Sequence, residues 1–196
     1  MSHNFTRKEK KRKEKKRKEK KNKRYKDQAS LLTMSVRRLI RSWTLFYHLP
    51  DDKRWTLASY PTIIKGMDSV EKITAMNREL SDDTIRFAML FIMAEGISPM
   101  WEDSNNRNGG CFSYKVFNKE VPEVWRTLIC HLCGHTLMKR KDNMQYVNGL
   151  TISPKKNFCI IKIWLSCCTL QDTSIIVDIV NLPNLGSIFR KHSPEF

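Results

Sequence analysis

The sequence predicts an α+β domain, in which an antiparallel sheet carries helices on one face and leaves the other face free for a ligand. Two observations lead to this fold class. Segments rich in β-branched and aromatic residues outnumber helical segments, and the few amphipathic helical segments stand apart among runs of strand-like sequence. With 196 residues and 40% hydrophobic content, the chain is long enough for one domain with a buried core.

The first 30 residues form a Lys/Arg-rich tail that we expect to be disordered. They hold 15 Lys/Arg against 4 Asp/Glu and repeat Arg-Lys-Glu-Lys-Lys three times from Arg7, which leaves no side chains for a core. Two interpretations stay open: an arm that binds RNA phosphates or acts as a nuclear import signal, and a solvated tail without a specific role. Residues 31–196, with 21 Lys/Arg against 16 Asp/Glu, are expected to form the folded domain.

The first elements of this domain follow from local patterns. Aromatic and β-branched residues in rough alternation predict a strand over 39–47. A helix is expected to begin at Asp68-Ser69, because Glu71 lies three residues after Asp68, as in a capping box. Its apolar positions recur near helical spacing: Val70, Ile73, Ala75 and Met76. Two further strands, over 87–93 and 112–117, are expected to flank a turn.

The second half of the domain is expected to add one helix and a hairpin. Pro122 near its start and Gly134 just past its end bracket the helix. Its apolar stripe consists of Trp125, Leu128, Ile129 and Leu132. Segments 146–152 and 158–165 read as the two strands of a hairpin. Segment 174–180 stays open between a capped helix, which Asp172 or Thr173 would begin, and a strand favoured by its β-branched residues.

Composition narrows the class of protein. No apolar run approaches the length of a membrane span, and no secretory signal follows the basic start, so we expect a cytoplasmic protein, with a nuclear location also open, and reduced cysteines. The cluster Cys130–His135, with two cysteines and two histidines, lacks a second ligand pair at zinc spacing, so its cysteines are interpreted as structural and no metal is expected. Without a nucleophile beside a base or a glycine-rich phosphate loop, the sequence predicts a binding protein rather than an enzyme, with no cofactor.

Two tryptophans in polar loops are the candidate binding residues. Trp101 and Glu102 stand side by side in the turn Pro99–Asp103, which Asn108-Gly109-Gly110 follows, and Trp55 ends the loop Asp51–Trp55. Two exposed indoles can stack on both faces of a flat ligand, and a neighbouring carboxylate accepts two parallel hydrogen bonds from a donor edge. This combination predicts a purine slot.

The order and spacing of several segments between residues 39 and 164 carry a resemblance. They are Trp43–Tyr47, Trp55, Gly96–Asp103, Asn108-Gly109-Gly110, Trp125 with Leu128-Ile129 and Gly134, and Ile161–Trp164. Together they resemble the eukaryotic translation initiation factor 4E family, the mRNA cap-binding proteins. The resemblance implies a curved sheet with helices on its convex face and the cap slot on its concave face.

The base-binding residues that the resemblance implies are Trp55, Trp101 and Glu102. The two tryptophans would sandwich the 7-methylguanine base, whose positive charge adds a cation–π interaction of roughly 1–2 kcal/mol. Glu102 would accept hydrogen bonds from N1 and N2 of the base while the Trp101 backbone N–H reaches O6. The other three tryptophans match scaffold positions: Trp43, Trp125 and Trp164.

The phosphate end departs from the family pattern. The position directly after Gly-Gly is usually arginine in the family, and here it is Cys111. Two further basic positions of the family are located by counting back from Trp164. One falls on Lys155, whereas the other falls on Ile160, with Lys162 two residues later. The residues from which a triphosphate clamp is expected are Arg107, Lys155, Lys156 and Lys162. A weaker clamp would lower cap affinity and flatten its salt dependence.

The face that binds protein partners in the family also departs from the pattern. The matching residues are Arg37-Arg38, Val70, Thr74 and Arg126, of which only the valine is retained. We therefore expect this face to bind the scaffold factor 4G weakly, or to bind a substitute for it. The other expected partner is capped mRNA, and the protein is expected to be a monomer. Recruitment of mRNA for translation is the first interpretation. The alternatives are a cap-binding repressor or sequestering variant, and an interaction module that has lost cap binding.

Overall fold

A computed structural model of the chain describes residues 14–21, 36–49, 51–184 and 186–193. The chain divides into two compact units, Met1–Val36 and Arg37–Phe196. In the first unit, residues 14–21 are helical, and Lys18 Nζ lies 3.2 Å from Glu14 Oε1 one turn away. The remainder of segment 1–35 lies outside the described residues, so the disordered tail over 1–30 and the start of the domain at residue 31 stay predictions.

The second unit is built on a curved sheet of seven strands, in which every neighbouring pair is antiparallel. In chain order the strands are β1 (Arg38–His48), β2 (Thr62–Ser69), β3 (Met89–Ala94), β4 (Gly110–Phe117), β5 (Val147–Pro154), β6 (Phe158–Leu165) and β7 (Ile188–Lys191). Their spatial order is β2-β1-β3-β5-β6-β4-β7, so the chain's last strand forms one edge of the sheet beside β4.

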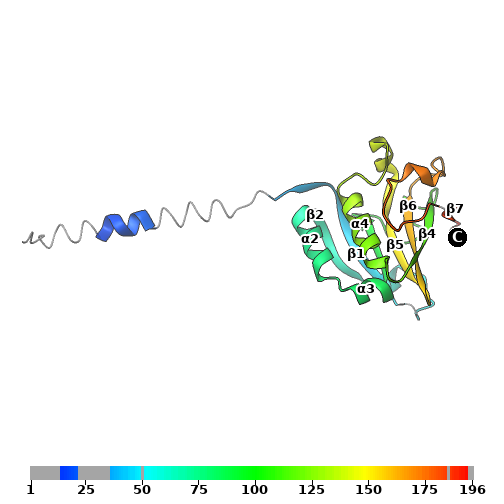
Figure 1. Cartoon of the computed structure of the whole chain (residues 1–196), viewed down its shortest axis with the longest axis horizontal. Helices are drawn as coiled ribbons and strands as arrows, with labels where there is room; N and C mark the ends of the chain where they lie inside the picture. The colour runs from blue at the N-terminus through cyan, green and yellow to red at the C-terminus, as the bar shows by residue number, and fades with distance from the viewer. Residues whose placement is uncertain (1–13, 22–35, 50, 185, 194–196) are drawn as a thin grey trace, which may run out of the picture. The chain divides into compact units, whose positions relative to one another are not determined.

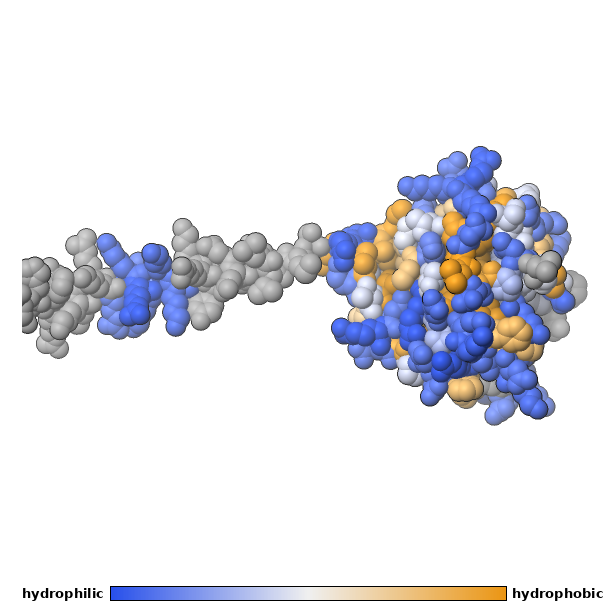
Figure 2. Space-filling model, in the orientation of Figure 1, coloured by the Kyte–Doolittle hydropathy of each residue, from blue (hydrophilic) through white to orange (hydrophobic). Residues whose placement is uncertain are grey.

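Three helices cover one face of this sheet (Figure 1). They are α2 (Val70–Glu79), α3 (Asp82–Phe87) and α4 (Val121–Cys133). Short 3-10 turns occupy Leu57–Ser59, Lys141–Tyr146 and Thr173–Ile175. The surface over the helices is largely hydrophilic, interrupted by a band of hydrophobic residues (Figure 2).

The core lies between the helices and the sheet. Side chains alternate between the two faces of a strand, and one set from each central strand is fully buried. These residues are Leu90 and Ile92 of β3, Leu150 and Ile152 of β5, and Ile161 and Ile163 of β6. Trp125, Leu128 and Ile129 of α4 are equally buried in the same cluster. The intervening residues of these strands therefore face the open side of the sheet.

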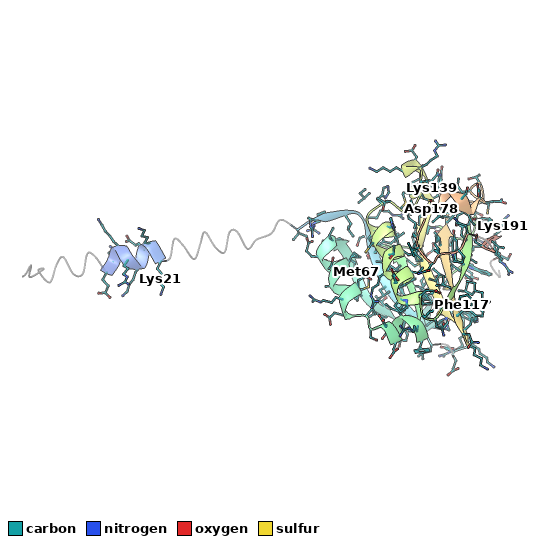
Figure 3. All side chains as sticks on the ribbon, viewed as in Figure 1. Lys21, Met67, Phe117, Lys139, Asp178 and Lys191 are labelled. Atoms are coloured by element: carbon teal, nitrogen blue, oxygen red, sulfur yellow. The ribbon has the colours of Figure 1, made fainter. Side chains whose placement is uncertain are left out.

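These elements confirm the predicted α+β class, the helix before Gly134 and the strands predicted from alternation. The details of α2 differ: its N-cap is Ser69, whose hydroxyl accepts from Lys72 N at 3.3 Å, while Asp68 forms ion pairs with Arg38 and Lys72. Segment 174–180 is neither a full helix nor a strand. It contains the end of a 3-10 turn and a single bridge from Ile176 to Met138, next to the ion pair between Lys139 and Asp178 (Figure 3).

The cysteines lie both in the core and at the surface of the domain. All six cysteines are free, with Cys133 buried in α4 and Cys130 exposed on it. Within the described ranges, no group of His, Cys, Asp and Glu side chains is arranged to hold a metal ion. None of the helices in the described part of the chain has the length and apolar character of a membrane span.

Candidate functional site

A pocket of about 380 Å³ opens on the helix-free face of the sheet. Its floor is made by alternate residues of three adjacent strands: Met89 and Phe91, Thr151 and Ser153, Lys162 and Trp164. Its walls come from loops and contribute Trp55, Tyr60, Pro99, Met100, Trp101, Glu102 and Ser193. The fold thus brings together Trp55, Trp101, Glu102 and Lys162, which lie far apart in the sequence.

Trp55 is held from behind by a buried histidine. The His48 ring, at the end of β1, is 1% exposed and stacks on the Trp55 ring at a centroid distance of 4.4 Å and an angle of 7°. His48 Nε2 lies 3.1 Å from the backbone oxygen of Arg54, the residue before Trp55. In the same loop, hydrogen bonds from Arg54 lower the pKa of Asp52 to about 2. Trp55 is 56% exposed, so its ring is held in place while the residue remains accessible to a ligand.

Tyr60 joins this wall to the floor. Its ring contacts His48 at 5.0 Å and meets Phe91 edge-on at 5.2 Å and 88°. Burial, together with the negative charge of Glu102, raises the pKa of Tyr60 to about 12, so its hydroxyl is neutral at pH 7. Sequence reasoning missed this residue, because a tyrosine after a polar loop carries no distinguishing pattern.

The loop that carries Trp101 is fixed by several hydrogen bonds within it. Asp103 accepts from Ser98 N at 2.8 Å and from Asn105 N at 2.9 Å. Burial acts to raise the pKa of the Asp103 carboxyl, but these hydrogen bonds outweigh it and the pKa lies below its usual value. Asn106, which is fully buried, donates to the carbonyls of Ser98 at 2.9 Å and Met100 at 2.8 Å. The backbone around Trp101 and Glu102 is therefore preorganised.

His192, just after β7, ties the end of the described domain to this loop. It is 2% exposed, its Nδ1 lies 2.8 Å from Asn106 O, and its backbone N–H donates to Gly109 O at 3.0 Å. Its ring stacks on Trp101 at 5.6 Å and 16° and lies 4.8 Å from the Trp164 ring. Burial lowers the pKa of His192, as does the charge of Lys162, so its ring is neutral at pH 7. A lone histidine near the C-terminus gave no sequence signal.

Trp164 has two roles, of which the sequence predicted one. It is 3% exposed, as expected of a scaffold residue, and its Nε1–H donates to Thr151 Oγ1 at 2.7 Å. It also forms part of the pocket floor, so the purely structural interpretation of Trp164 is incomplete. Trp43 and Trp125 are buried core residues, in agreement with the prediction.

Only one of the four predicted phosphate ligands lines the pocket. Lys162 does so, with Nζ 5.8 Å from the centroid of the Trp101 ring. Lys155 and Lys156 are exposed where β5 turns into β6, and Arg107 is exposed in the loop after Trp101; none of the three borders the pocket. Their role in binding phosphate stays a prediction.

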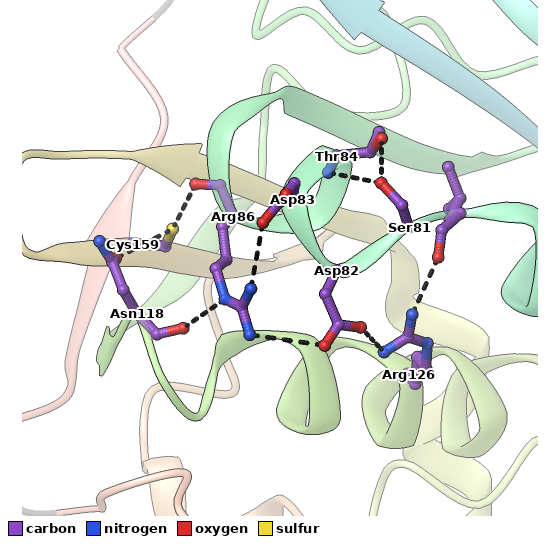
Figure 4. Close-up of polar contacts among 9 residues, drawn as sticks. Ser81, Asp82, Asp83, Thr84, Arg86, Asn118, Arg126 and Cys159 are labelled. Atoms are coloured by element: carbon purple, nitrogen blue, oxygen red, sulfur yellow. Dashed lines mark hydrogen bonds and ion pairs between the residues drawn. The ribbon is translucent and has the colours of Figure 1, made fainter.

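On the helix-covered face, Arg126 is already engaged with its own domain. Its Nη1 lies 2.7 Å from Asp82 Oδ1 and its Nη2 donates to Leu80 O at 2.8 Å, so it joins α4 to the junction of α2 and α3 (Figure 4). Val70 is half-buried at the start of α2, and Thr74 is exposed on the same helix. This face therefore offers a charged, internally paired surface at the position of the expected partner site.

Comparison with known proteins identifies the family. The sequence model described as "Eukaryotic initiation factor 4E" matches residues 38–186, which is well over half of the chain. The chain belongs to the eukaryotic initiation factor 4E family. The factor 4E family consists of cap-binding proteins rather than enzymes, and the resemblance seen in the tryptophan segments is confirmed.

Individual relatives of the factor 4E family are distant. The initiation factor 4E homolog of Acanthamoeba polyphaga mimivirus is 40% identical over 62 residues, which cover 32% of this chain and 23% of the viral protein. Initiation factor 4E-1 of Schizosaccharomyces pombe is 25% identical over 166 residues, which cover 79% of this chain and 74% of the yeast protein. The viral match is thus local, whereas the yeast match spans most of both chains.

Solved factor 4E structures share the fold. Ascaris suum eIF4E-3, solved with m7G cap, superposes with a TM-score of 0.60 at 21% identity, over 68% of this chain and 76% of that chain. Schistosome eIF4E, solved with m7GpppG and 4E-BP, gives a TM-score of 0.59 at 18% identity, over 69% of this chain and 75% of that chain. At these identities the likeness shows the fold, and the site must be argued from its own residues.

Proposed function

We propose that this chain binds the 7-methylguanosine cap of mRNA and acts in translation initiation in the cytoplasm, as a monomer. The observation that carries the proposal is the meeting of Trp55, Trp101 and Glu102 in one pocket of a factor 4E fold. The cap-bound Ascaris and Schistosome structures, which have the same fold, support it.

The chemistry of the pocket suits a methylated guanine. The base stacks between the indoles of Trp55 and Trp101, and its positive charge strengthens this stacking by roughly 1–2 kcal/mol. Glu102, whose side chain has no hydrogen-bond partner among the described residues, accepts from N1 and N2 of the base, and the Trp101 N–H donates to O6. Lys162 beside Trp101 supplies a positive charge where the phosphates begin.

The test is retention on immobilised 7-methyl-GTP. We expect wild-type protein to be retained and to be eluted by free 7-methyl-GTP but not by GTP, because only the methylated base is cationic. Trp55→Ala and Glu102→Gln should abolish retention. Glu123→Gln, which removes an exposed carboxylate on α4, is the matched control and should be retained normally. Equal elution by GTP and 7-methyl-GTP would contradict the proposal.

The position of Arg126 favours a second candidate role, in which the protein holds caps without the usual scaffold factor and so represses translation. Arg126 stands at one of the positions that match the family's partner-binding face, and there it is paired with Asp82 and Leu80 of its own domain. Co-purification of scaffold factor 4G with the cap-bound protein separates the two roles, since a repressor would not bring it along. Failure to bind any cap analogue would instead indicate an interaction module that has lost cap binding.

A further inference from the structure

The phosphate end of the pocket lacks a cation where the family has one. Cys111, directly after Gly109-Gly110, is 1% exposed, and burial raises the pKa of its thiol, so it carries no charge at pH 7. Ile160, at the second altered position, is also uncharged and lies half-buried in β6. Among the described residues that line the pocket, Lys162 is the only cation, so a triphosphate would be poorly neutralised.

The neighbouring edge strand brings an arginine to the same place. In the antiparallel pair of β4 and β7, Arg190 lies directly opposite Cys111, and on the other side of β4 Trp164 lies opposite Cys111. Opposite residues of an antiparallel pair project from the same face, with Cβ atoms about 4.5–5.5 Å apart. Arg190 therefore projects from the face that carries Trp164 and the pocket, one strand away from Cys111.

The position along β7 agrees with this assignment. Arg190 precedes His192 by two residues, so in an extended chain the two side chains share a face at a spacing of about 7 Å. His192 is the residue that stacks on Trp101. On the other side, Lys162 lies opposite Ser113, one step along the same face of β4 from Cys111. Arg190 and Lys162 thus flank β4 next to the tryptophan that would hold the base.

The positive charges of Lys162 and Arg190 both act on the Cys111 thiol. Both Lys162 and Arg190 lower the pKa of the Cys111 thiol, although burial outweighs them, so each cation lies close to it. Arg190 is exposed. Among the described residues, no carboxylate forms an ion pair with Arg190 or Lys162, so both charges are available for an anion.

We propose that Arg190 replaces the arginine missing at Cys111 and, together with Lys162, binds the triphosphate bridge of the cap. This inference rests on the proposed cap binding. A guanidinium suits the task, because it pairs with phosphate oxygens through two parallel hydrogen bonds and keeps its charge at every physiological pH. The positive charge that the family carries on β4 is thus supplied from the neighbouring strand β7, and the phosphate end of the pocket remains positively charged.

The test is a titration of intrinsic tryptophan fluorescence with 7-methyl-GMP and 7-methyl-GTP. For Arg190→Gln we expect a loss of about 3- to 10-fold in affinity for the triphosphate, since a charge-assisted contact is removed, and little change for the monophosphate. The slope of log affinity against log salt for 7-methyl-GTP should flatten by about one unit. Arg190→Lys should recover part of the loss.

Lys191→Gln is the matched control. Lys191 is exposed at the edge of the sheet (Figure 3). It lies opposite Gly110, next to the Cys111–Arg190 pair, so it projects from the other face of β7. Lys191→Gln removes one positive charge from the same strand, and we expect it to reduce affinity for 7-methyl-GTP by less than half as much as Arg190→Gln does. Equal effects of the two variants, or an equal loss for monophosphate and triphosphate, would overturn the role of Arg190. If wild-type protein did not prefer 7-methyl-GTP over GTP, the proposed function would fail instead.

Discussion

At the scale of single residues, the two pocket tryptophans share one arrangement: each has a buried histidine against its ring. His48 stacks on Trp55 and His192 stacks on Trp101. Each histidine has one ring nitrogen engaged with a backbone carbonyl and one without a partner among the described residues, Nδ1 of His48 and Nε2 of His192. The neutral ring of His192 supports the Trp101 indole without placing a second positive charge beside the stack that would receive a cationic base.

The buried His192 predicts a pH-dependent stability. Its pKa lies below the ordinary value of 6.5, first because of burial and also because of Lys162, while the hydrogen bond with Asn106 and the charge of Glu102 act in the opposite direction. The unfolded chain therefore takes up a proton near pH 6.5 while the folded chain leaves His192 neutral. The free energy of unfolding should decrease as the pH falls below about 6.5 and level off below the folded pKa.

Urea unfolding of wild type and His192→Phe between pH 5 and 7.5 measures this effect. We expect the variant to lose part of the decrease in stability at low pH, because phenylalanine does not titrate. His131→Phe, on α4 and away from the pocket, is the control and should keep the pH dependence of wild type. A His192→Phe profile parallel to that of wild type would contradict the prediction.

At the scale of elements, Arg126 fixes the arrangement of the three helices. Besides Asp82 Oδ1 and Leu80 O, its Nε donates to Asn77 O at 3.4 Å, so it satisfies carbonyl groups at the end of α2. Arg126→Leu should therefore lower the free energy of unfolding by about 1–3 kcal/mol while leaving affinity for 7-methyl-GTP unchanged. Chemical unfolding and fluorescence titration measure the two quantities.

The control for Arg126→Leu is the same substitution at Arg78. Arg78 is exposed on α2 and, among the described residues, pairs only with the adjacent Glu79, so its replacement should change stability by no more than about 0.5 kcal/mol. If the two variants were equally stable, the contacts of Arg126 would be superficial and its position would be open to a partner. A parallel loss of cap affinity would show that the two faces of the sheet are coupled.

The elements that the sequence predicts well are those with a local signal. The strand at Trp43, the helix between Pro122 and Gly134, and the turn with Trp101 and Glu102 each combine a hydrophobic period with turn or cap residues. The sequence misses β2, which contains Gly66 at φ +67° and whose register with β1 shifts. It also misses the six-residue helix α3 and the four-residue strand β7.

The missed parts of the site have the same physical cause. Arg190 and His192 acquire their places because β7 pairs with β4, more than 70 residues earlier in the chain. Such pairing depends on tertiary packing, which no local pattern of residues specifies. The resemblance points to Trp55, Trp101 and Glu102, because these residues stand in two loops that are recognisable from local sequence. Which cations lie at the phosphate end depends on which distant strand pairs with β4. Sequence position alone therefore suggested Lys155, Lys156 and Arg107 and did not suggest Arg190.

At the scale of the whole molecule, the chain divides into two units, and we expect them to bind different parts of a capped RNA. The domain pocket has room for a nucleotide of roughly the size of the cap, at about 380 Å³. The first 30 residues carry a net charge of +11, more than twice the +5 of residues 31–196. A charge of this density binds phosphates without sequence preference and with steep salt dependence. We therefore expect the domain to set specificity for the cap and the tail to add affinity for the RNA that follows it.

Deletion of residues 1–30 tests this division. Affinity for 7-methyl-GTP should stay within about two-fold of wild type, since no residue of the pocket is removed and the folded unit begins at Arg37. Affinity for a capped RNA of about 20 nucleotides should fall by about tenfold or more at 50 mM salt and by much less at 200 mM, because counterion release weakens as salt rises. An uncapped RNA of the same sequence isolates the contribution of the tail. If the deletion abolished binding of 7-methyl-GTP, the tail would belong to the fold; if it left RNA affinity unchanged at low salt, the basic repeats would be a solvated segment without a role in binding.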